Sequence, residues 1–352
     1  MNQDLLKEII RPLLKWYENN ARTLPWRDSP TPYHVWLSEI MLQQTRVEAV
    51  KSYYKRFTSA YPTIEDLAIA PEEDLMKLWE GLGYYSRLRN LHKTARIVKE
   101  SYRGELPNSY EELLKLPGIG TYTAGAISSI AFGKAAPAVD GNVMRVISRV
   151  TASTDNISDA KTKKQMEQVL TKVMPKKRTG DFNQALMELG ATVCIPNGVP
   201  LCEKCPLIGL CMGNHQGIAE KLPVKNIKKA RKIEERTILM ITYKNQLAII
   251  KRPAKGLLAG LWELPNIEGN ISIQEAGNYV KSLGFTTLKT VELPSSKHIF
   301  THIEWHMIGY HIEIENIIDN QFIFVEKEQL MQKYTIPHAF KTYMDYYYNN
   351  TR

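Results

Sequence analysis

Apolar residues recur every three or four positions from residue 5 to about residue 220, and proline or glycine often ends a run. Such spacing gathers apolar side chains on one face of a helix, so it predicts a series of amphipathic helices. A clear case is the run before Gly83, which consists of Leu75, Leu78, Trp79 and Leu82. Pro12 lies inside the first run, and we expect that helix to begin near Pro12 or to be kinked there. This part of the chain is therefore predicted to be all-α.

The pattern changes after residue 236. Arg236–Tyr243 and Gln246–Lys251 are rich in β-branched residues and flank a short turn at Lys244-Asn245, which predicts a β-hairpin. The elements expected next are a helix near Ile273–Leu283, strands near Thr287–Leu293, Lys297–Ile303 and Trp305–Ile314, and a final helix from about Pro337 to Tyr348. This mixture predicts a second domain of α+β type.

The composition is that of a soluble globular protein. The chain has 352 residues, of which 43% are hydrophobic and 24% are charged, and this length can form two or three domains. The N-terminal run MNQDLLKEIIRPLLKWYENN contains acidic residues and no uninterrupted apolar segment, and no other stretch approaches the length of a membrane span. We therefore expect a cytoplasmic protein that does not contact a membrane, and we also expect it to be a monomer.

Positive charge is concentrated in residues 221–236. The formal net charge of the chain is +9, and these sixteen residues contain seven Lys or Arg against two Asp or Glu. Such a run is commonly a solvated linker between domains. If both flanking domains face one polyanion, the run also attracts a phosphate backbone in a salt-sensitive way.

The segment LPGIGTYTAGAI, residues 116–127, predicts a turn that grips a phosphate. Gly118 and Gly120 allow the chain to turn tightly between one helix and a second helix that begins near Thr121. Backbone N–H groups left bare at that helix start favour a phosphate oxygen. The pattern therefore predicts a helix-hairpin-helix that binds DNA, and a plain turn between two helices is the alternative.

All four cysteines lie within eighteen residues of one another. Disulfides are not expected in a long chain without a secretion signal, so a metal site is the better account. Four thiolates suit either tetrahedral zinc or an iron–sulfur cluster. Only two of the cysteines form a close pair, which favours a [4Fe–4S] cluster but leaves zinc open. The four candidate ligands are Cys194, Cys202, Cys205 and Cys211.

Two carboxylates are candidates for acid–base chemistry. Glu39 lies off the apolar stripe of its predicted helix and has no Lys or Arg three or four residues away. In a cleft its pKa would rise and it could act as a general acid, whereas a surface glutamate is the simpler alternative. Asp140 precedes an apolar helical stripe and is a natural N-cap, which would keep it ionised beside a developing positive charge. Cleavage through an oxocarbenium-like sugar requires such a pair.

Several motifs together resemble the MutY family of adenine-specific mismatch DNA glycosylases, across essentially the whole chain. They are WLSEIMLQQTRV (36–47), GLGYYSRLRNLH (81–92), LPGIGTYTAGAI (116–127), VDGNVMRVISR (139–149), the four cysteines and FTH (300–302). The resemblance implies a base excision repair enzyme that removes adenine mispaired with 8-oxoguanine or guanine in double-stranded DNA. It also implies a [4Fe–4S] cluster and a location at the bacterial nucleoid.

The same resemblance implies a domain organisation. It consists of a helical catalytic domain at 1–220, a basic linker at 221–236 and a Nudix-like domain at 237–352 that inspects the oxidised base. Within the catalytic domain, a six-helix barrel at about 26–133 would stand beside a cluster subdomain built from 1–25 and 134–220.

The resemblance further implies roles for individual residues. Glu39 would protonate adenine N7, and Asp140 would stabilise the cationic sugar or capture it covalently before water attacks. Tyr122 and Asn142 match positions that support these two groups. The remaining matches are Arg27 and Gln184 around the extruded adenine, Gln44 and Tyr84 in the gap left in the duplex, Gly118 and Gly120 at the DNA backbone, Phe300, Thr301 and His302 at 8-oxoguanine, and the four cysteines at the cluster.

Three other activities are weighed against this one. Endonuclease III-like enzymes have a lysine where Tyr122 stands, and that amine forms a Schiff base and cuts the strand, so Tyr122 predicts a monofunctional glycosylase. Nudix hydrolases hold Mg²⁺ with several glutamates on one helix, whereas QEAGNYVKSLGF offers only Glu275, which argues against nucleotide hydrolysis. A non-catalytic lesion-binding protein is not expected to retain both Glu39 and Asp140.

Overall fold

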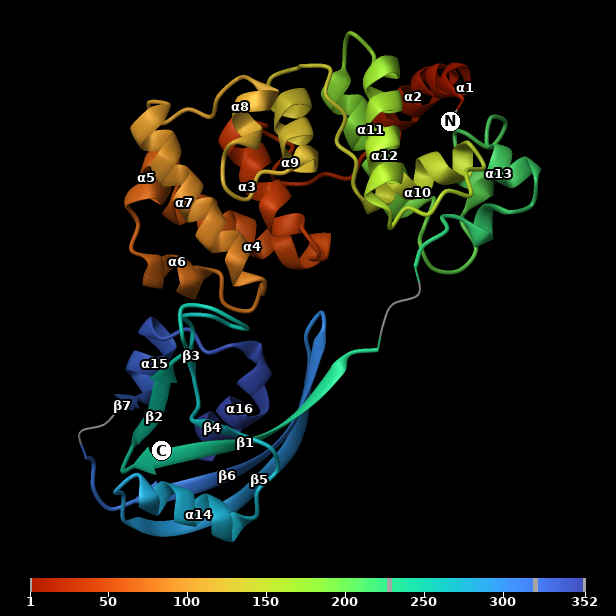
Figure 1. The fold of residues 1–352 in the computed structure, drawn as a ribbon. Coiled ribbons are helices and arrows are strands. Elements are labelled where there is room, and N and C mark those ends of the chain that lie inside the picture. Colours follow the sequence, from red (N-terminus) through yellow and green to blue (C-terminus); the bar gives the residue numbers. More distant parts are fainter. Residues whose placement is uncertain (1, 227–229, 319–321, 351–352) are drawn as a thin grey trace. The chain divides into compact units, whose positions relative to one another are not determined.

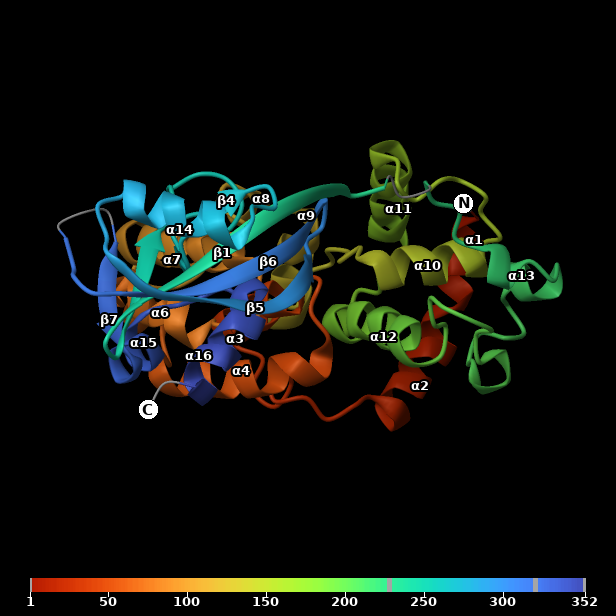
Figure 2. The same ribbon diagram turned by 90° about the horizontal axis from the view of Figure 1, so that it is seen from below.

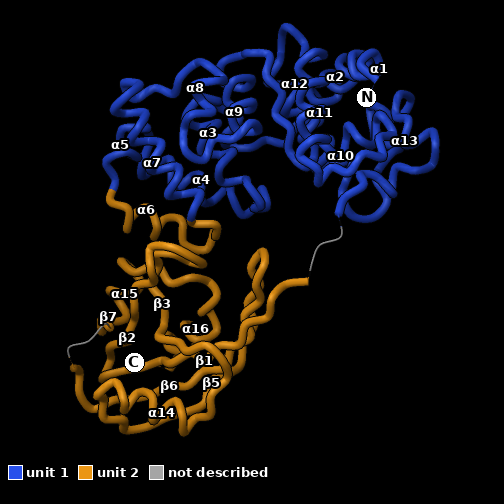
Figure 3. The backbone as a smooth tube through the Cα atoms, viewed as in Figure 1, with its two compact units in different colours: residues 1–70, 86–227 blue, residues 71–85, 228–352 orange. Residues whose placement is uncertain are grey.

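The chain forms two compact units in a computed structural model that describes residues 2–226, 230–318 and 322–350 (Figure 1 and Figure 3). Unit 1 comprises residues 1–70 and 86–227, and unit 2 comprises residues 71–85 and 228–352. Unit 2 is therefore discontinuous in sequence, because a short segment of the helical half is grouped with the C-terminal domain. None of the described helices is both long and apolar enough to cross a membrane.

Unit 1 is helical, as the apolar spacing predicts. Its first two helices break at Ile9, and the second begins two residues before Pro12, close to the predicted position. Its helices are α1 (Gln3–Glu8), α2 (Ile10–Asn20), α3 (Pro32–Leu42), α4 (Val47–Ala60), α5 (Ile64–Ile69), α7 (Tyr85–Ser101), α8 (Tyr110–Leu114), α9 (Thr121–Ala126) with a π-helical turn (Ile127–Ala131), α10 (Gly141–Val150), α11 (Ala160–Val173), α12 (Thr179–Thr192) and α13 (Met212–His215).

One core of unit 1 joins segments that are distant in sequence. Leu6, Ile9 and Leu13 of the first two helices are fully buried in the same cluster as Val146 of α10 and Phe182 of α12. Helices α2 and α12 accordingly lie side by side in Figure 1 and Figure 2. This packing holds the start of α10 against α12, and both elements contribute to the site described below.

The predicted hairpin lies between α8 and α9. Gly118 has a φ of +78°, and a Cβ at this position would stand 2.7 Å from the Cβ of Asn90, so both conformation and packing require glycine. Gly120 differs, because its backbone is extended and a Cβ would meet nothing within 4 Å. The turn therefore depends on Gly118, whereas Gly120 leaves open space in front of the first N–H groups of α9.

Unit 2 contains one mixed sheet with helices on both faces. The strand order is β3-β2-β1-β6-β5, with β1 and β6 parallel, β4 paired to β1 and β7 paired to β2. Helix α14 packs on one face, where it is seen in Figure 2, and α15 and α16 pack on the other. The elements are α6 (Glu72–Leu78), β1 (Lys232–Tyr243), β2 (Gln246–Lys251), β3 (Trp262–Glu263), β4 (Asn266–Glu268), α14 (Ile273–Ser282), β5 (Thr287–Ile299), β6 (Ile303–Ile314), β7 (Ile323–Glu326), α15 (Lys327–Lys333) and α16 (Lys341–Asn350).

Several sequence-based expectations for this unit are met and others are revised. The β1–β2 hairpin is confirmed, with Tyr243 paired to Gln246 across the predicted turn. The separate strands expected at Thr287–Leu293 and Lys297–Ile303 are instead one strand, β5. It continues through a bulge between Leu293 and Ser296, where Pro294 has no N–H to donate to the ladder.

The expected linker at 221–236 is shorter in the structure than in the sequence analysis. Strand β1 begins at Lys232, so the last five of these residues belong to the sheet. Residues 227–229 of the expected linker lie outside the described residues. The basic side chains at the end of this run are therefore presented by a strand, because β1 extends past the hairpin to pair with β6 as far as Lys232.

Candidate active site

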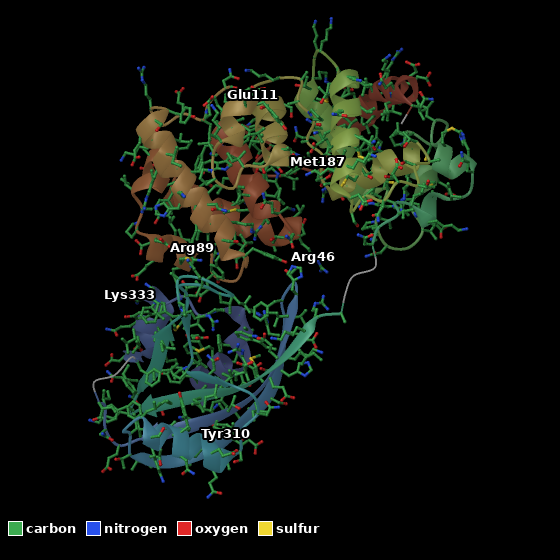
Figure 4. All side chains as sticks on the ribbon, viewed as in Figure 1. Arg46, Arg89, Glu111, Met187, Tyr310 and Lys333 are labelled. Carbon is green, nitrogen blue, oxygen red and sulfur yellow. The ribbon has the colours of Figure 1, made fainter. Side chains whose placement is uncertain are left out.

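A cavity of about 680 Å³ opens in unit 1 among α3, α9, α10 and α12. This volume lies within the range typical of small-molecule sites. Met187, labelled in Figure 4, contributes to its wall from α12. The residues predicted for chemistry and for the adenine pocket all line this one cavity: Arg27, Glu39, Tyr122, Asp140, Asn142 and Gln184.

Glu39 is buried, so the alternative of a surface glutamate is wrong. Thr31 caps α3 by accepting a hydrogen bond from the N–H of His34, and Pro32 occupies the first turn. Packing on nearly all sides of this helix leaves Glu39 only 7% exposed. Burial raises its pKa to about 7, although a hydrogen bond from the Tyr122 hydroxyl partly opposes the shift.

Tyr122 lies beside Glu39, one of the two candidate carboxylates. Its hydroxyl donates to Oε2 of Glu39 and also lies 3.7 Å from the Sδ of Met187. Burial raises the pKa of this phenol well above its ordinary value, and the charges of Glu39 and Asp140 add to the effect. The phenol is therefore a neutral hydrogen-bond donor, which matches a supporting role beside Glu39.

Asp140 is the N-cap of α10, as predicted. Its Oδ1 accepts from the backbone N–H of Val143 at 2.7 Å, and its Oδ2 accepts from the amide of Asn142 at 2.7 Å. The sequence argument expects these donors and the helix start to hold the carboxylate ionised. In the structure, burial raises the pKa of Asp140 above its ordinary value, and the hydrogen bonds only reduce that rise.

Arg145 supports this carboxylate and was missed by the sequence analysis. It is 7% exposed, and its Nη2 donates to Oδ1 of Asn142 at 2.8 Å and to the carbonyl of Gly190 at 2.7 Å. Because Oδ1 of Asn142 accepts from Arg145, the amide nitrogen of Asn142 faces Asp140. An arginine on an apolar helix, three residues after Asn142, was the available signal.

Arg27 and Gln184, which also line the cavity, contact each other. The Nε of Arg27 donates to Oε1 of Gln184 at 3.1 Å, which leaves the amide nitrogen of Gln184 with no other hydrogen-bond partner among the described residues. Glu188, also missed by the sequence analysis, pairs with Arg27 at 2.8 Å and with Arg22 at 2.5 Å, and its side chain is 1% exposed. Burial alone would raise the pKa of Glu188, but the two arginines lower it, so it is a buried carboxylate that fixes their positions.

The two residues predicted for the duplex gap share an unusual backbone conformation. Gln44, an exposed residue in the wall of the cavity, has a φ of +57°, and Tyr84, 44% exposed in unit 2, has a φ of +51°. Non-glycine residues rarely adopt this left-handed conformation, and strain of this kind is concentrated at functional positions. Five other described non-glycine residues, Lys244 of the β1–β2 turn among them, also have a positive φ, so the conformation is compatible with a role in the duplex gap and is not specific to it.

A tight contact between α10 and α12 suggests a test of how closely the site is packed. A Cβ added at Gly190 would stand 2.6 Å from the Cβ of Asn142, so Gly190→Ala should displace the amide that binds Asp140. We expect a loss of about 1 to 3 kcal/mol in stability and slower base excision, the activity that the sequence resemblance implies. Gly277→Ala, in a helix where a Cβ meets nothing within 4 Å, is the control and should be neutral or stabilising. Thermal unfolding and single-turnover excision would check both, and unchanged excision by Gly190→Ala would contradict the account.

The four cysteines surround one small cavity behind α10. Among the described residues, no three His, Cys, Asp or Glu side chains are close enough to hold a single metal ion. Burial raises the pKa of Cys205 to about 12 and also raises those of Cys202 and Cys211. Arg149, 2% exposed, places its guanidinium 3.3 Å from the Sγ of Cys194 and can neutralise thiolate charge. This donor set fits an iron–sulfur cluster.

Phe300, Thr301 and His302 form the turn between β5 and β6. Phe300 packs edge-on against Trp305 with ring centroids 5.0 Å apart, whereas Thr301 and His302 are exposed at the tip. Glu275, by contrast, closes a capping box in which its Oε2 accepts from the N–H of Ser272 at 2.7 Å. The turn thus presents two hydrogen-bonding side chains, and the lone glutamate of α14 serves its helix.

Two family models match separate parts of the chain. The model described as HhH-GPD superfamily base excision DNA repair protein matches residues 37–176, and the model described as NUDIX domain matches residues 237–346. Together with the structure, they confirm the predicted fold class of an all-α helix-hairpin-helix domain followed by an α+β Nudix-like domain.

Similar proteins include adenine DNA glycosylases from bacteria, plants and animals. The protein of Buchnera aphidicola (subspecies Schizaphis graminum) is 36% identical over 84% of this chain and 85% of its own length. The human protein is 36% identical over 86% of this chain and 66% of its own length. The Arabidopsis thaliana protein is 37% identical over 84% of this chain, which spans only 56% of that relative.

Solved structures support the fold of the helical part. A thermostable thymine-DNA glycosylase is 31% identical and superposes with a TM-score of 0.56, covering 60% of this chain and 98% of its own. Endonuclease III trapped in a covalent DNA intermediate is 26% identical with a TM-score of 0.53, covering 62% of this chain and 99% of its own. The helical part of the chain therefore has the endonuclease III fold.

Proposed function

Because the chain belongs to the adenine DNA glycosylase family, we propose that it removes adenine mispaired with 8-oxoguanine or guanine from double-stranded DNA. The observation that carries this proposal is the pair of buried carboxylates, Glu39 and Asp140, in the wall of one cavity. The products are free adenine and a strand with an abasic site.

The hydrogen bonds of the two carboxylates indicate where the proton resides. Asp140 accepts on both oxygens, from Val143 and Asn142, and these donors favour its ionised form relative to an equally buried carboxyl without them. Glu39 accepts one hydrogen bond, from Tyr122, and its pKa is raised to about 7. We therefore assign the proton to Glu39, which acts as the general acid, and the negative charge to Asp140.

The proton goes from Glu39 to N7 of the extruded adenine. The N-glycosidic bond then breaks, its electron pair goes to the purine, and neutral adenine leaves a sugar with oxocarbenium character. Asp140 stabilises this cation or bonds to it until water adds a hydroxyl group to C1′ and gives up a proton. Arg145 and Asn142 hold Asp140 in place, whereas the Arg27–Gln184 pair presents an amide donor to the base.

Extrusion of the adenine requires energy from contacts with the rest of the duplex. Unstacking and unpairing one nucleotide costs a few kcal/mol, about the amount that stacking and phosphate contacts return. Gln44 and Tyr84 fill the gap, and the open face of the Gly118–Gly120 turn binds the strand's phosphate. The exposed Thr301 and His302, beside Phe300, read the base opposite adenine, which differs between guanine and 8-oxoguanine at N7 and C8.

We infer that Cys194, Cys202, Cys205 and Cys211 hold a [4Fe–4S] cluster. Their position around one cavity, the uneven spacing in sequence and the adjacent Arg149 all support this inference. The cluster would order the loop between α12 and α13, and Arg145, which donates to the carbonyl of Cys194 at 2.7 Å, ties that loop to Asn142.

An assay of bound elements distinguishes the cluster from zinc. We expect iron and acid-labile sulfide in equal amounts in the isolated protein, and substitution of Cys205 by serine should lower both together with the thermal stability. Zinc without sulfide would contradict the assignment. Glu203→Gln is a suitable control. Glu203 is exposed and follows Cys202 directly, so the substitution changes the same loop without removing a thiol.

One observation keeps a lyase activity in consideration. Tyr122 leaves no amine at the position where endonuclease III-like enzymes have one, yet Lys163 of α11 also lines the cavity. Its Nζ stands 3.8 Å from Glu167, which accepts a hydrogen bond from Thr121 at 2.7 Å. The amine of Lys163 is thus paired with a carboxylate, whereas the position that carries the lyase amine in endonuclease III-like enzymes holds the phenol of Tyr122, and we infer a monofunctional glycosylase.

The function is tested with duplexes that carry adenine opposite 8-oxoguanine. Strand breaks that need alkali support a monofunctional glycosylase. Breaks without alkali, together with borohydride trapping that disappears in Lys163→Met, would instead show a lyase. Binding with no excision at all would support a lesion-binding protein and overturn the proposal.

A further inference from the structure

The segment Pro71–Tyr85 is a structural part of unit 2, although its ends continue into the helices of unit 1. It contains α6 and the turn that ends in Tyr84. Near the end of α6, the Nζ of Lys77 donates to the carbonyl of Tyr334 at 3.1 Å and pairs with Oε2 of Glu80 at 2.7 Å. Oε1 of Glu80 accepts from the backbone N–H of Ile336 at 3.1 Å. Two charged side chains therefore attach α6 to the backbone that follows α15.

This attachment reaches strands of the sheet. Tyr334 packs edge-on against Trp262 of β3 with ring centroids 5.0 Å apart, and the carbonyl of Thr335 accepts a hydrogen bond from the backbone N–H of Trp262 at 3.3 Å. The backbone that Lys77 and Glu80 bind is thus held by the C-terminal domain itself. A displacement of that backbone would be transmitted to α6.

The turn after α6 is closed by a hydrogen bond from a buried side chain. The indole Nε1 of Trp79, a fully buried residue, donates to the carbonyl of Gly83 at 3.0 Å. Gly81, Gly83 and Tyr84 all have positive φ values, of +91°, +75° and +51°. A turn closed by a buried tryptophan cannot bend freely, so the position of Tyr84 follows that of α6.

The chain continues from Tyr84 directly into α7, and the first turn of α7 contacts α3. The guanidinium of Arg87, 8% exposed, donates to the carbonyls of Ile40 and Met41, each at 2.9 Å. These two residues follow Glu39 in α3. Arg87 thus attaches the start of α7, which directly follows Tyr84 in the chain, to the helix that carries Glu39.

We propose that Lys77 and Glu80 are positioning residues that couple recognition of the base opposite adenine, by the C-terminal domain, to the placement of Tyr84 in the duplex. This inference rests on the proposed function, because it requires an enzyme that distinguishes 8-oxoguanine from guanine. Lys77 and Glu80 do not touch the substrate. They set the excision rate for the lesion by holding the turn in the position that the occupied C-terminal domain favours.

The test compares single-turnover excision from duplexes with adenine opposite 8-oxoguanine and opposite guanine, in the full-length protein. Glu80→Ala removes the acceptor for Ile336, and we expect the rate with 8-oxoguanine to fall about tenfold, a usual size for coupling between sites. The rate with guanine should change less than about twofold, because the C-terminal domain distinguishes guanine from 8-oxoguanine and guanine therefore does little to favour one position of the turn. Lys77→Met should have the same effect on the two rates. It can replace Glu80→Ala in the test if Glu80→Ala fails to fold.

Two further variants separate coupling from a general loss of structure. Glu80→Gln keeps a carbonyl oxygen for Ile336 and should restore most of the rate with 8-oxoguanine. Asp74→Ala removes an exposed carboxylate from the same helix and should change neither rate. Equal losses with both partner bases, or no loss in Glu80→Ala and Lys77→Met, would overturn the coupling while leaving the glycosylase assignment intact. A wild-type protein with equal rates on both duplexes would overturn the partner preference, and this inference with it.

Discussion

Glu39→Gln is expected to abolish most of the adenine excision activity while leaving the fold intact. The amide has the size of the carboxyl group and can still accept the hydrogen bond from Tyr122, but it has no proton to give to adenine N7. Loss of a general acid lowers rates by roughly 10²- to 10⁴-fold, and the effect should be in the chemical step rather than in DNA binding. Single-turnover excision and duplex affinity, measured on the same preparation, would separate the two.

The pH dependence of the wild-type enzyme follows from the same group. The pKa of Glu39 is raised to about 7, and the acid is active when protonated. We therefore expect kcat/KM to be lost as the pH rises through about 7, with a tenfold decrease per pH unit above that value. A rate that rises through the same range would show that Glu39 acts as a base.

The stability of Glu39→Gln should change in the opposite direction to its activity. The carboxyl ionises at about 4.5 in the unfolded chain and at about 7 in the folded one, so between these values the folded state becomes progressively less stable as pH rises. Above pH 7 the accumulated cost is about 3 kcal/mol, which the neutral amide avoids. The variant should therefore unfold at a higher temperature than the wild type at pH 8, and at the same temperature at pH 4. An inactive variant that is less stable at pH 8 would point to a structural role.

Asp140→Asn should produce the second large loss. The substitution removes the negative charge that stabilises the sugar cation, and the loss of one such electrostatic contact lowers rates by roughly 10²- to 10³-fold. Asparagine still caps a helix, so Val143 retains an acceptor, although the amide of Asn142 loses its carboxylate partner. Excision should fall by at least that factor, with folding and duplex affinity nearly unchanged.

A matched control is available for this substitution. Asp159 is also the N-cap residue of a helix, α11, but it is exposed and makes no side-chain capping bond. Asp159→Asn removes the same charge from a helix start and should leave excision at the wild-type rate. If Asp140→Asn retained more than a tenth of the activity, the anion would not be part of the chemistry.

Much of the local structure follows from short-range patterns in the sequence. The spacing of apolar residues predicts the helical half, and the change to β-branched runs predicts the β1–β2 hairpin at its observed register. Asp140 is recognisable as an N-cap because capping depends on residues within one turn of a helix. Glycine, proline and cysteine impose equally local constraints, so the turn at Gly118 and the grouping of the four thiols were both predictable.

Other features depend on residues that are distant in sequence, and no periodic pattern contains them. The hydroxyl that contacts Glu39 comes from a residue 83 positions later, and Glu188 meets Arg22 across 166 positions. Burial and pKa values depend on all the atoms that surround a group, so the raised pKa of Glu39 and the raised, rather than lowered, pKa of Asp140 were decided by packing.

The division of the chain was decided in the same way. The sequence determined that α6 is a helix, because its apolar residues recur with the helical period. Only the tertiary structure groups it with the C-terminal domain, because the hydrogen bonds of Lys77 and Glu80 are made with backbone more than 250 residues away along the chain. A chain's local preferences are set by its neighbours in sequence, whereas its contacts and charges are set by its neighbours in space.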